Sequence, residues 1–455
     1  MDAETCHSIA WEYLRAGETQ LALEHALRAH ELKRNNLDFL NTLGVVYGEA
    51  GQLDLAEATF RKLLKRKPGF VNALVNLGKA LEKQERLDEA RAHYERALAI
   101  EPAFPKLAAN LASIYRERGE PDRSRTVLER HAQHVEPQDL VMGMAQSTDE
   151  VRASAMLQDA ARQHPEWLLV RNALAHALLA AGEWREGWRR YARPGVAPFA
   201  PRLDGRGILL RGEQGIGDVL FFLRFVPALR ARGAAIRLAC EKKLWPILDL
   251  PRADAGEEEV LLGDLPARLD TAEVAPPWPL KVEQSARERL AALGPAPYLA
   301  VTWRAGTDTA RGREFGAERS ALTKAVPPKA LGEALRGWRG TTILLQRGAR
   351  AGDAAQFGAG FGAPFHDLSA LGDDLPALLA VLSAVDEYVG VSNTNMHLLA
   401  GIGRSARVLV PFPAEWRWLR REGRSPWFPD FPVYRQPASR DWSAPLAALR
   451  GDLGL

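Results

Sequence analysis

The chain has 455 residues, of which 46% are hydrophobic and 26% are charged, as in ordinary folded globular proteins. At roughly 150 residues per domain, this length predicts about three domains. The 60 basic and 57 acidic residues leave a net charge of only +3, which argues against nucleic acid or a charged membrane surface as a partner. The two cysteines, Cys6 and Cys240, offer neither a disulfide framework nor a CxxC metal site.

The sequence contains no recognisable targeting or membrane segment. Its first residues include acids and lack the apolar stretch of a signal peptide. No run reaches the ~18 apolar residues that a membrane-spanning helix needs. We therefore expect a cytoplasmic protein without a transmembrane segment.

Residues 1–137 contain an internal repeat with a period of 34. Three columns keep this period: a turn column (Gly17, Gly51, Glu85, Gly119), a small-residue column (Ala10, Gly44, Gly78, Ala112) and a large-residue column (Phe60, Tyr94, Leu128). The pattern resembles the tetratricopeptide repeat (TPR), a helix–turn–helix unit of this length. Four such units cover about residues 5–137.

Residues 138–193 continue the helical region less regularly. The register is poor from 138 to 165 and returns at Leu168, where residues around Gly182 repeat the spacing seen around Gly51. We interpret 138–193 as an irregular helical segment followed by a last repeat that docks on the next domain.

A stacked array of this kind presents a groove that binds extended peptides or helices. The alternative is that it only dimerises or serves as a rigid spacer. Four asparagines fall on the expected first helices, which would line the groove: Asn41, Asn72, Asn76 and Asn110. They are suited to hold a peptide backbone, or else they form a solvated face.

After the proline-rich segment 194–201, strand and helix patterns alternate, which predicts parallel sheets. We expect one α/β lobe over 194–296 and a second over 297–455, with ligands bound where the strands end. The expected strands are Gly207–Arg211, Ala235–Cys240, Tyr298–Trp303, Thr341–Gln346, Glu387–Val391 and Ala406–Pro411, and the expected helices include Asp218–Arg232, Lys242–Leu248 and Leu375–Val385.

Three segments resemble bacterial TPR-linked glycosyltransferases related to heptosyltransferases. They are GEQGIGDVLFFLRFVP (212–227), VGVSNTNMHLLAGIGRSARVLVPFPAEWRWL (389–419) and SPWFPDFPVYRQ (425–436). The resemblance implies a GT-B fold with two Rossmann-like lobes, a nucleotide-sugar donor held mainly by the C-terminal lobe, and a protein acceptor recruited by the repeats. The alternatives are a lipid-linked or cell-surface glycan as acceptor, and a non-catalytic TPR scaffold.

The first segment is expected to serve the acceptor side of the site. The resemblance implies that Asp218 is the general base, although an aspartate here would also serve as a helix N-cap. Glu213 and Gln214 are placed to hydrogen-bond the acceptor or sugar. Gly215 and Gly217 would let the backbone approach a ligand closely.

The second segment is expected to hold the donor diphosphate at a helix start. The residues implied are Ser392, Asn393, Thr394, Asn395 and His397. Asn393 stands where the family pattern has an aspartate, which removes a charge and changes either the donor or the activity. The alternative is simple helix capping beside a core histidine.

Four further residues are expected on the donor side. Arg304, Gly306 and Lys324 suit the phosphates, with surface cations as the alternative, and Gln346 suits the nucleotide base or ribose. Asp373 and Asp374 match a helix start rather than a metal site, so we expect no metal and no cofactor. Three tryptophans, Trp416, Trp418 and Trp427, are expected in the core rather than stacked on a sugar.

Overall fold

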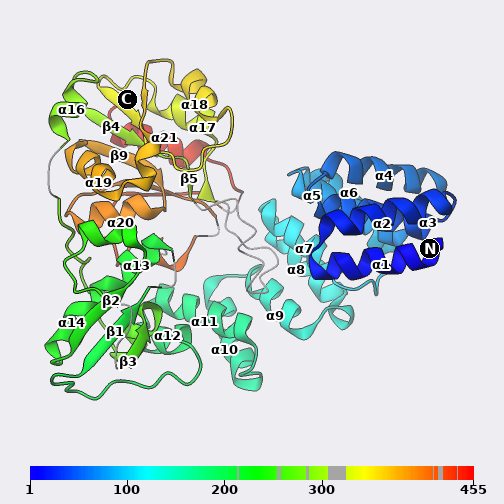
Figure 1. The fold of residues 1–455 in the computed structure, drawn as a ribbon, viewed down its shortest axis with the longest axis horizontal. Coiled ribbons are helices and arrows are strands. Elements are labelled where there is room, and N and C mark those ends of the chain that lie inside the picture. The colour runs from blue at the N-terminus through cyan, green and yellow to red at the C-terminus, as the bar shows by residue number, and fades with distance from the viewer. Residues whose placement is uncertain are drawn as a thin grey trace. The chain divides into compact units, whose positions relative to one another are not determined.

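The computed structural model describes residues 1–212, 215–253, 258–282, 286–305, 324–412, 414–418, 424–437 and 439–455. Contacts within the chain divide it into two compact units, Met1–Val170 and Arg171–Leu455. The first unit is helical, and the second combines helices with parallel sheets (Figure 1).

The first unit is a solenoid of helix pairs. Four pairs follow the predicted repeat, namely α1 (Ala3–Ala16) with α2 (Thr19–Leu32), α3 (Leu37–Glu49) with α4 (Leu53–Arg66), α5 (Val71–Lys83) with α6 (Leu87–Ile100), and α7 (Leu107–Glu117) with α8 (Pro121–Arg130). The first helices also bond to one another, because Asn76 Nδ2 donates to Asn41 Oδ1 at 3.2 Å. Asn41, Asn72, Asn76 and Asn110 all lie on first helices, as expected.

The small-residue column exists because the two helices of a pair touch there. A Cβ atom on Gly44 would lie 2.6 Å from the Phe60 ring, and one on Gly78 would lie 2.4 Å from the Tyr94 ring. The turn column has a left-handed backbone, which glycine adopts without steric cost. Its members are Gly17 (φ 80°), Gly51 (φ 75°), Glu85 (φ 63°) and Gly119 (φ 72°).

The segment predicted to be irregular forms a further helix pair. After η1 (Ala132–His134), α9 (Pro137–Ala145) packs against α10 (Glu150–Gln163). The register was lost because α9 has only 9 residues where α3 and α5 have 13. The solenoid therefore continues through this segment.

The second unit begins with a last helix pair, α11 (Leu168–Ala181) and α12 (Trp184–Tyr191), of which α11 starts three residues before the boundary. Its first sheet has the parallel order β2-β1-β3, formed by β1 (Gly207–Arg211), β2 (Ala235–Ala239) and β3 (Glu258–Leu261). The flanking helices are α13 (Ile216–Phe222), η2 (Leu223–Phe225), α14 (Val226–Ala231), η3 (Lys242–Ile247), η4 (Leu262–Asp264) and α15 (Leu265–Arg268).

The single helix predicted over Asp218–Arg232 was wrong. The chain forms α13, η2 and α14 in succession, with Pro227 in the first turn of α14. Proline lacks the N–H that a continuous helix would need at this point. Likewise, the helix predicted at Lys242–Leu248 is the 3₁₀ helix η3, which contains Pro246.

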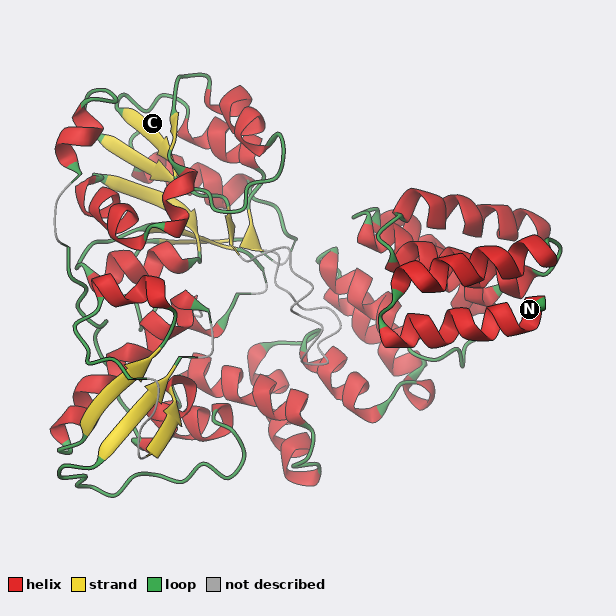
Figure 2. Ribbon diagram, viewed as in Figure 1, coloured by secondary structure: helices red, strands yellow, loops and turns green. Residues whose placement is uncertain are grey.

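The second sheet is wholly parallel, in the order β11-β10-β9-β4-β7-β8. Its strands are β4 (Tyr298–Val301), β7 (Thr341–Leu344), β8 (His366–Asp367), β9 (Glu387–Val391), β10 (Arg407–Val410) and β11 (Val433–Arg435). Figure 2 draws the strands of the second unit as yellow arrows among red helices. The chain builds the sheet outward from β4 in one direction through β7 and β8, and in the other through β9, β10 and β11. The switch in strand order therefore lies between β4 and β9, where ligands of such sheets usually bind.

Helices and a two-stranded β-ribbon surround this sheet. The helices are α16 (Arg287–Ala291), α17 (Pro328–Leu335), α18 (Asp353–Phe361), η6 (Ser369–Asp373), α19 (Leu375–Ala384), α20 (Thr394–Gly401), η7 (Trp416–Trp418) and α21 (Ser443–Asp452). The ribbon pairs β5 (Arg304–Ala305) antiparallel with β6 (Lys324–Ala325). Asp374 caps α19, since its carboxylate accepts from the Ala377 N–H, as its helix-start pattern predicts.

A continuous aromatic core joins α12 to the elements around both sheets. The Trp188 ring of α12 lies 5.4 Å from that of Trp416 and 5.6 Å from that of Trp427. Trp416, Trp418 and Trp427 are all buried in this core, as predicted. The last helix pair thus packs with the α/β part of the second unit.

Candidate functional site

In the first predicted segment, α13 follows the carboxyl end of β1. Gly215 is the N-cap of α13 and makes no side-chain cap. Asp218 lies within the first turn of α13, so its alternative interpretation as the N-cap was wrong. Its side chain is 38% exposed. Glu213 and Gln214 lie outside the described residues.

The second predicted segment lies directly against the first. A Cβ atom on Gly217 would lie 3.1 Å from His397 Cδ2 and 3.7 Å from Thr394 Cα. Helices α13 and α20 are therefore in contact at their N-terminal turns, and Gly217 is the residue that allows it. The fold brings together two segments that the sequence places about 175 positions apart.

Asp218 is paired with a cation from η7. Arg417 Nη2 donates to Asp218 Oδ1 at 2.5 Å. The guanidinium also lies over the Trp416 ring at 4.5 Å and over the Phe221 ring at 4.6 Å. Burial disfavours the charged form of Arg417, but the carboxylates of Asp218 and Glu415 outweigh it and raise the pKa of Arg417. Arg417 is therefore a permanent positive charge beside the predicted base.

Glu415 connects the donor-side residues. Its Oε1 accepts a hydrogen bond from Ser392 Oγ at 2.7 Å, and its Oε2 forms an ion pair with Lys324 Nζ. Burial opposes ionisation of this carboxyl, yet Lys324 and Arg417 overcome it and lower its pKa to about 2. Glu415 is therefore ionised across the physiological range, and it orients two residues that the resemblance assigns to the donor.

Two neutral histidines border these charges. His397 lies in the first turns of α20 among the rings of Phe221 and Phe428, and its burial, with the positive charge of Arg417, lowers its pKa well below the usual value. On α11, desolvation by surrounding atoms and the charge of Arg417 lower the pKa of His176 to about 4. His176 as a whole residue is nevertheless exposed.

A buried polar network occupies the switch point between β4 and β9. Asn393 is the N-cap of α20, since its Oδ1 accepts from the Asn395 N–H at 3.0 Å, and its Nδ2 donates to Thr302 Oγ1 at 2.9 Å. Tyr388 Oη lies 2.9 Å from both Thr302 Oγ1 and Asn395 Nδ2. The capping role that the sequence left open therefore belongs to Asn393, and the same side chain links the two strand ends.

Gln346 bonds to the backbone of its own protein. Its Oε1 accepts from the N–H groups of Trp303 and Arg304, and its Nε2 donates to the carbonyls of Arg304 and Arg347. The side chain is 2% exposed. Gln346 thus positions the loop after β4, and a direct contact with a nucleotide does not fit this arrangement.

The remaining predicted cations lie on the β5–β6 ribbon. Arg304 is opposite Ala325 and Lys324 is opposite Ala305, so the two basic residues occupy diagonal positions near the switch point. Gly306 lies outside the described residues.

Sequence reasoning missed Glu415, Arg417 and His176. The first two stand within PAEWRWL, beside tryptophans that were expected in the core. Charged residues next to buried tryptophans were the signal that could have identified them. His176 directly follows the small-residue position Ala175 of the last repeat. Nothing local distinguishes it, because its neighbours in the site come from η7 and α12.

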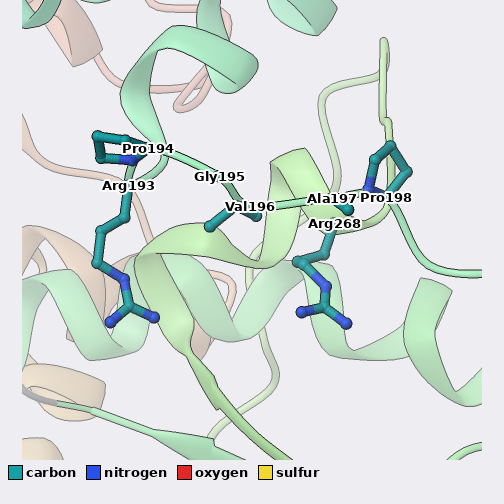
Figure 3. Close-up of a pocket in the computed structure, with 7 residues that line it drawn as sticks. All are labelled: Arg193, Pro194, Gly195, Val196, Ala197, Pro198 and Arg268. Carbon is teal, nitrogen blue, oxygen red and sulfur yellow. The ribbon is translucent and has the colours of Figure 1, made fainter.

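A separate cavity of about 380 Å³ lies along the proline-rich segment, lined by Arg193, Pro194, Gly195, Val196, Ala197, Pro198 and Arg268 (Figure 3). Both of its arginines are paired: Arg193 with Asp264, and Arg268 with Glu258.

Within the described residues, no group of three or more His, Cys, Asp or Glu side chains is arranged to hold a metal ion. The described helices include none long and apolar enough to cross a membrane.

Comparison with known proteins identifies the repeats. Two tetratricopeptide-repeat family models match the chain, one at residues 8–69 and 41–108 and the other at residues 81–139. The N-terminal region therefore consists of TPR repeats. A curated relative is Protein FlbA of Caulobacter vibrioides, which is 26% identical over 342 residues, covering 62% of this chain and 54% of FlbA. The chain thus spans about half the length of the curated relative it matches.

Solved structures with TPR folds also align with the chain. A tetratricopeptide repeat protein from Parabacteroides merdae matches with 14% identity and a TM-score of 0.36, covering 42% of this chain and 77% of its own. PilF of Pseudomonas aeruginosa matches with 19% identity and a TM-score of 0.35, covering 41% of this chain and 86% of its own.

Proposed function

We propose that the second unit transfers a sugar from a nucleotide-sugar donor to a protein, and that the TPR repeats recruit that protein. The observation that carries the proposal is the meeting of the two segments that resemble glycosyltransferases. Gly217 contacts the start of α20, while Asp218 is held by Arg417 next to Glu415 and Lys324. A GT-B arrangement of two Rossmann-like lobes is part of the same proposal.

In this reaction Asp218 takes a proton from the acceptor while the acceptor attacks the anomeric carbon of the sugar. The bond from that carbon to the diphosphate oxygen breaks, and the nucleoside diphosphate leaves with the bonding electrons. Its negative charge needs cations and N–H donors. Lys324, Arg304 and the N-terminal N–H groups of α20 are suited to supply them.

The ion pairs shape how a donor would bind. Lys324 and Arg417 both face carboxylates, Glu415 and Asp218. A diphosphate that approached either cation would compete with those carboxylates. Binding would therefore loosen the Asp218–Arg417 pair and make Asp218 a stronger proton acceptor at the moment the donor is in place.

Calorimetric titration of the whole protein with UDP-, ADP-, GDP- and CMP-sugars tests the donor. We expect one of them to bind, and we expect Asp218→Asn to abolish transfer without weakening donor binding, as for loss of a general base. A variant with wild-type turnover would show that Asp218 is not the base. If no nucleotide sugar binds, the result supports the alternative of a non-catalytic TPR scaffold.

Mass spectrometry of proteins from wild-type and deletion cells tests the acceptor. A glycan lost from one or more proteins in the deletion cells supports a protein acceptor. If every protein glycan persists while a surface polysaccharide changes, the acceptor is a lipid-linked or cell-surface glycan.

A further inference from the structure

One side chain of the last repeat stands at the candidate site. His176 belongs to α11, and its ring centroid lies 6.0 Å from that of Tyr191 and 6.5 Å from that of Trp416. Arg417, which neighbours Trp416 in η7, pairs with Asp218. A continuous row of contacts therefore leads from α11 to the predicted base.

His176 is more exposed than the tryptophan it packs against. Trp416 is 4% exposed, and Trp188, which lies against Trp416, is 1% exposed, so both tryptophan rings serve the core. His176 as a whole residue is exposed, yet the protein around its imidazole, with Arg417 nearby, lowers its pKa to about 4. It is therefore a neutral imidazole with one donor and one acceptor nitrogen, on a residue at the surface of the protein.

The repeat register shows which position of a repeat His176 occupies. His176 follows Ala175 as Trp11, Val45, Lys79 and Ser113 follow the small residues of the first four repeats. All five positions lie on the first helix of a pair, and first helices line the inner face of repeat arrays of this kind. His176 thus occupies, in the last repeat, a position that in the other repeats belongs to the binding face.

We infer that His176 is an acceptor-binding residue, and that the inner face of α11 is the part of the acceptor site nearest to Asp218. This inference rests on the proposed function and makes it more specific. The acceptor is a polypeptide segment that lies along the first helix of the last repeat. The imidazole hydrogen-bonds this segment and holds the acceptor group beside the Asp218 carboxylate.

The test uses the full-length protein, the nucleotide sugar that binds in calorimetry, and a purified protein that loses its glycan in deletion cells. His176→Ala should raise the KM for that acceptor at least tenfold, while the donor Kd and the thermal unfolding temperature stay unchanged. His176→Asn keeps a donor and an acceptor atom and should recover part of the affinity. The matched control is His164→Ala, since this partly exposed histidine is stacked on Trp167 in the preceding turn.

Two results would overturn the inference, and they differ in scope. An unchanged acceptor KM in an active His176→Ala enzyme would remove His176 from the acceptor site and leave the proposed function intact. A wild-type protein that binds no nucleotide sugar, or cells in which no protein loses a glycan, would remove the proposed function and this inference with it.

Discussion

The Asp218 carboxylate lies 2.5 Å from the Arg417 guanidinium, and the two residues are 199 positions apart in the sequence. This pair links α13, which follows the first sheet's central strand, to η7, which follows the second sheet's β10. The predicted base is therefore held in place by the part of the chain that also carries Glu415. Its position depends on the association of both α/β parts.

Replacing Arg417 by methionine should harm both activity and stability. Methionine keeps an apolar stem among the Trp416 and Phe221 rings but leaves the buried Glu415 without one of its neighbouring cations. Breaking a buried pair by removing one partner costs about 3–5 kcal/mol, and the partial exposure of Asp218 places this case at about 2–4 kcal/mol. Urea unfolding measures the loss, and Arg417→Lys, which keeps the charge, should lose less. Equal losses in both variants would contradict the role of the charge.

The loss of unfolding free energy at acid pH should depend on Glu415. Its pKa is lowered from 4.5 to about 2 in the folded protein, so its ionisation stabilises the fold above pH 4.5, and this contribution is lost as pH falls toward 2. The linkage amounts to up to about 3 kcal/mol. The difference in unfolding free energy between wild type and Glu415→Gln should therefore shrink between pH 7 and pH 3. A difference that is constant with pH would show that the ion pair contributes no such linkage.

Gly217 and Gly215 form a matched pair of substitution sites. Valine at Gly217 would press on His397 and Thr394, whereas a Cβ atom on Gly215 meets nothing within 4 Å, and the Gly215 backbone has an ordinary φ of −60°. We expect Gly217→Val to destabilise the second unit by about 1–3 kcal/mol, with Gly215→Val near neutral. Thermal unfolding followed by circular dichroism compares them. Similar losses at both positions would argue against close contact of α13 and α20.

In the first unit, Gly78 and Tyr94 should behave as a coupled pair. Alanine at Gly78 would place a Cβ 2.4 Å from the Tyr94 ring, so Gly78→Ala should destabilise the repeats by about 1–3 kcal/mol despite alanine's better helix propensity. Adding Tyr94→Leu removes the ring from that space, and the double variant should lose less than the sum of the single changes. Additive losses would mean that the two helices do not meet there.

Asn393→Asp should fold normally. Aspartate retains the cap on α20, and the Thr302 and Tyr388 hydroxyls can reorient so that every polar group in the network keeps a partner. Asn393→Leu loses the cap and its bond to Thr302, which should cost about 1–3 kcal/mol. Unfolding in urea distinguishes the two. A large loss in the aspartate variant would show that the amide donor itself is required.

Local patterns accounted for much of this structure. The repeat columns predicted the first four helix pairs because each pair must bring a small residue against a ring, as at Gly78 and Tyr94. Strands β1 and β9 have the bounds that their short apolar runs predicted. The cap at Asn393 follows from short-range backbone chemistry, which a sequence displays directly.

What the sequence did not display depends on distant partners. β3 has only four residues, two of them glutamates, and it is a strand because β1 pairs with it. The partner of Asp218 comes from η7, and that of Lys324 from the residue just before η7. Gln346 was assigned to a ligand because its backbone partners around Trp303 lie 42 and 43 residues away.

The packing of Trp188 on Trp416 and Trp427 bears on how such proteins diversify. The residue spacing of the last repeat matches that of the other repeats, but its aromatic contacts are with the α/β part of the chain. The boundary between the two compact units accordingly falls at Val170. Ahead of that boundary, repeats can be gained, lost or exchanged without uncovering the aromatic core. A recombination point at the proline-rich segment, in contrast, would leave Trp416 and Trp427 without the ring that covers them.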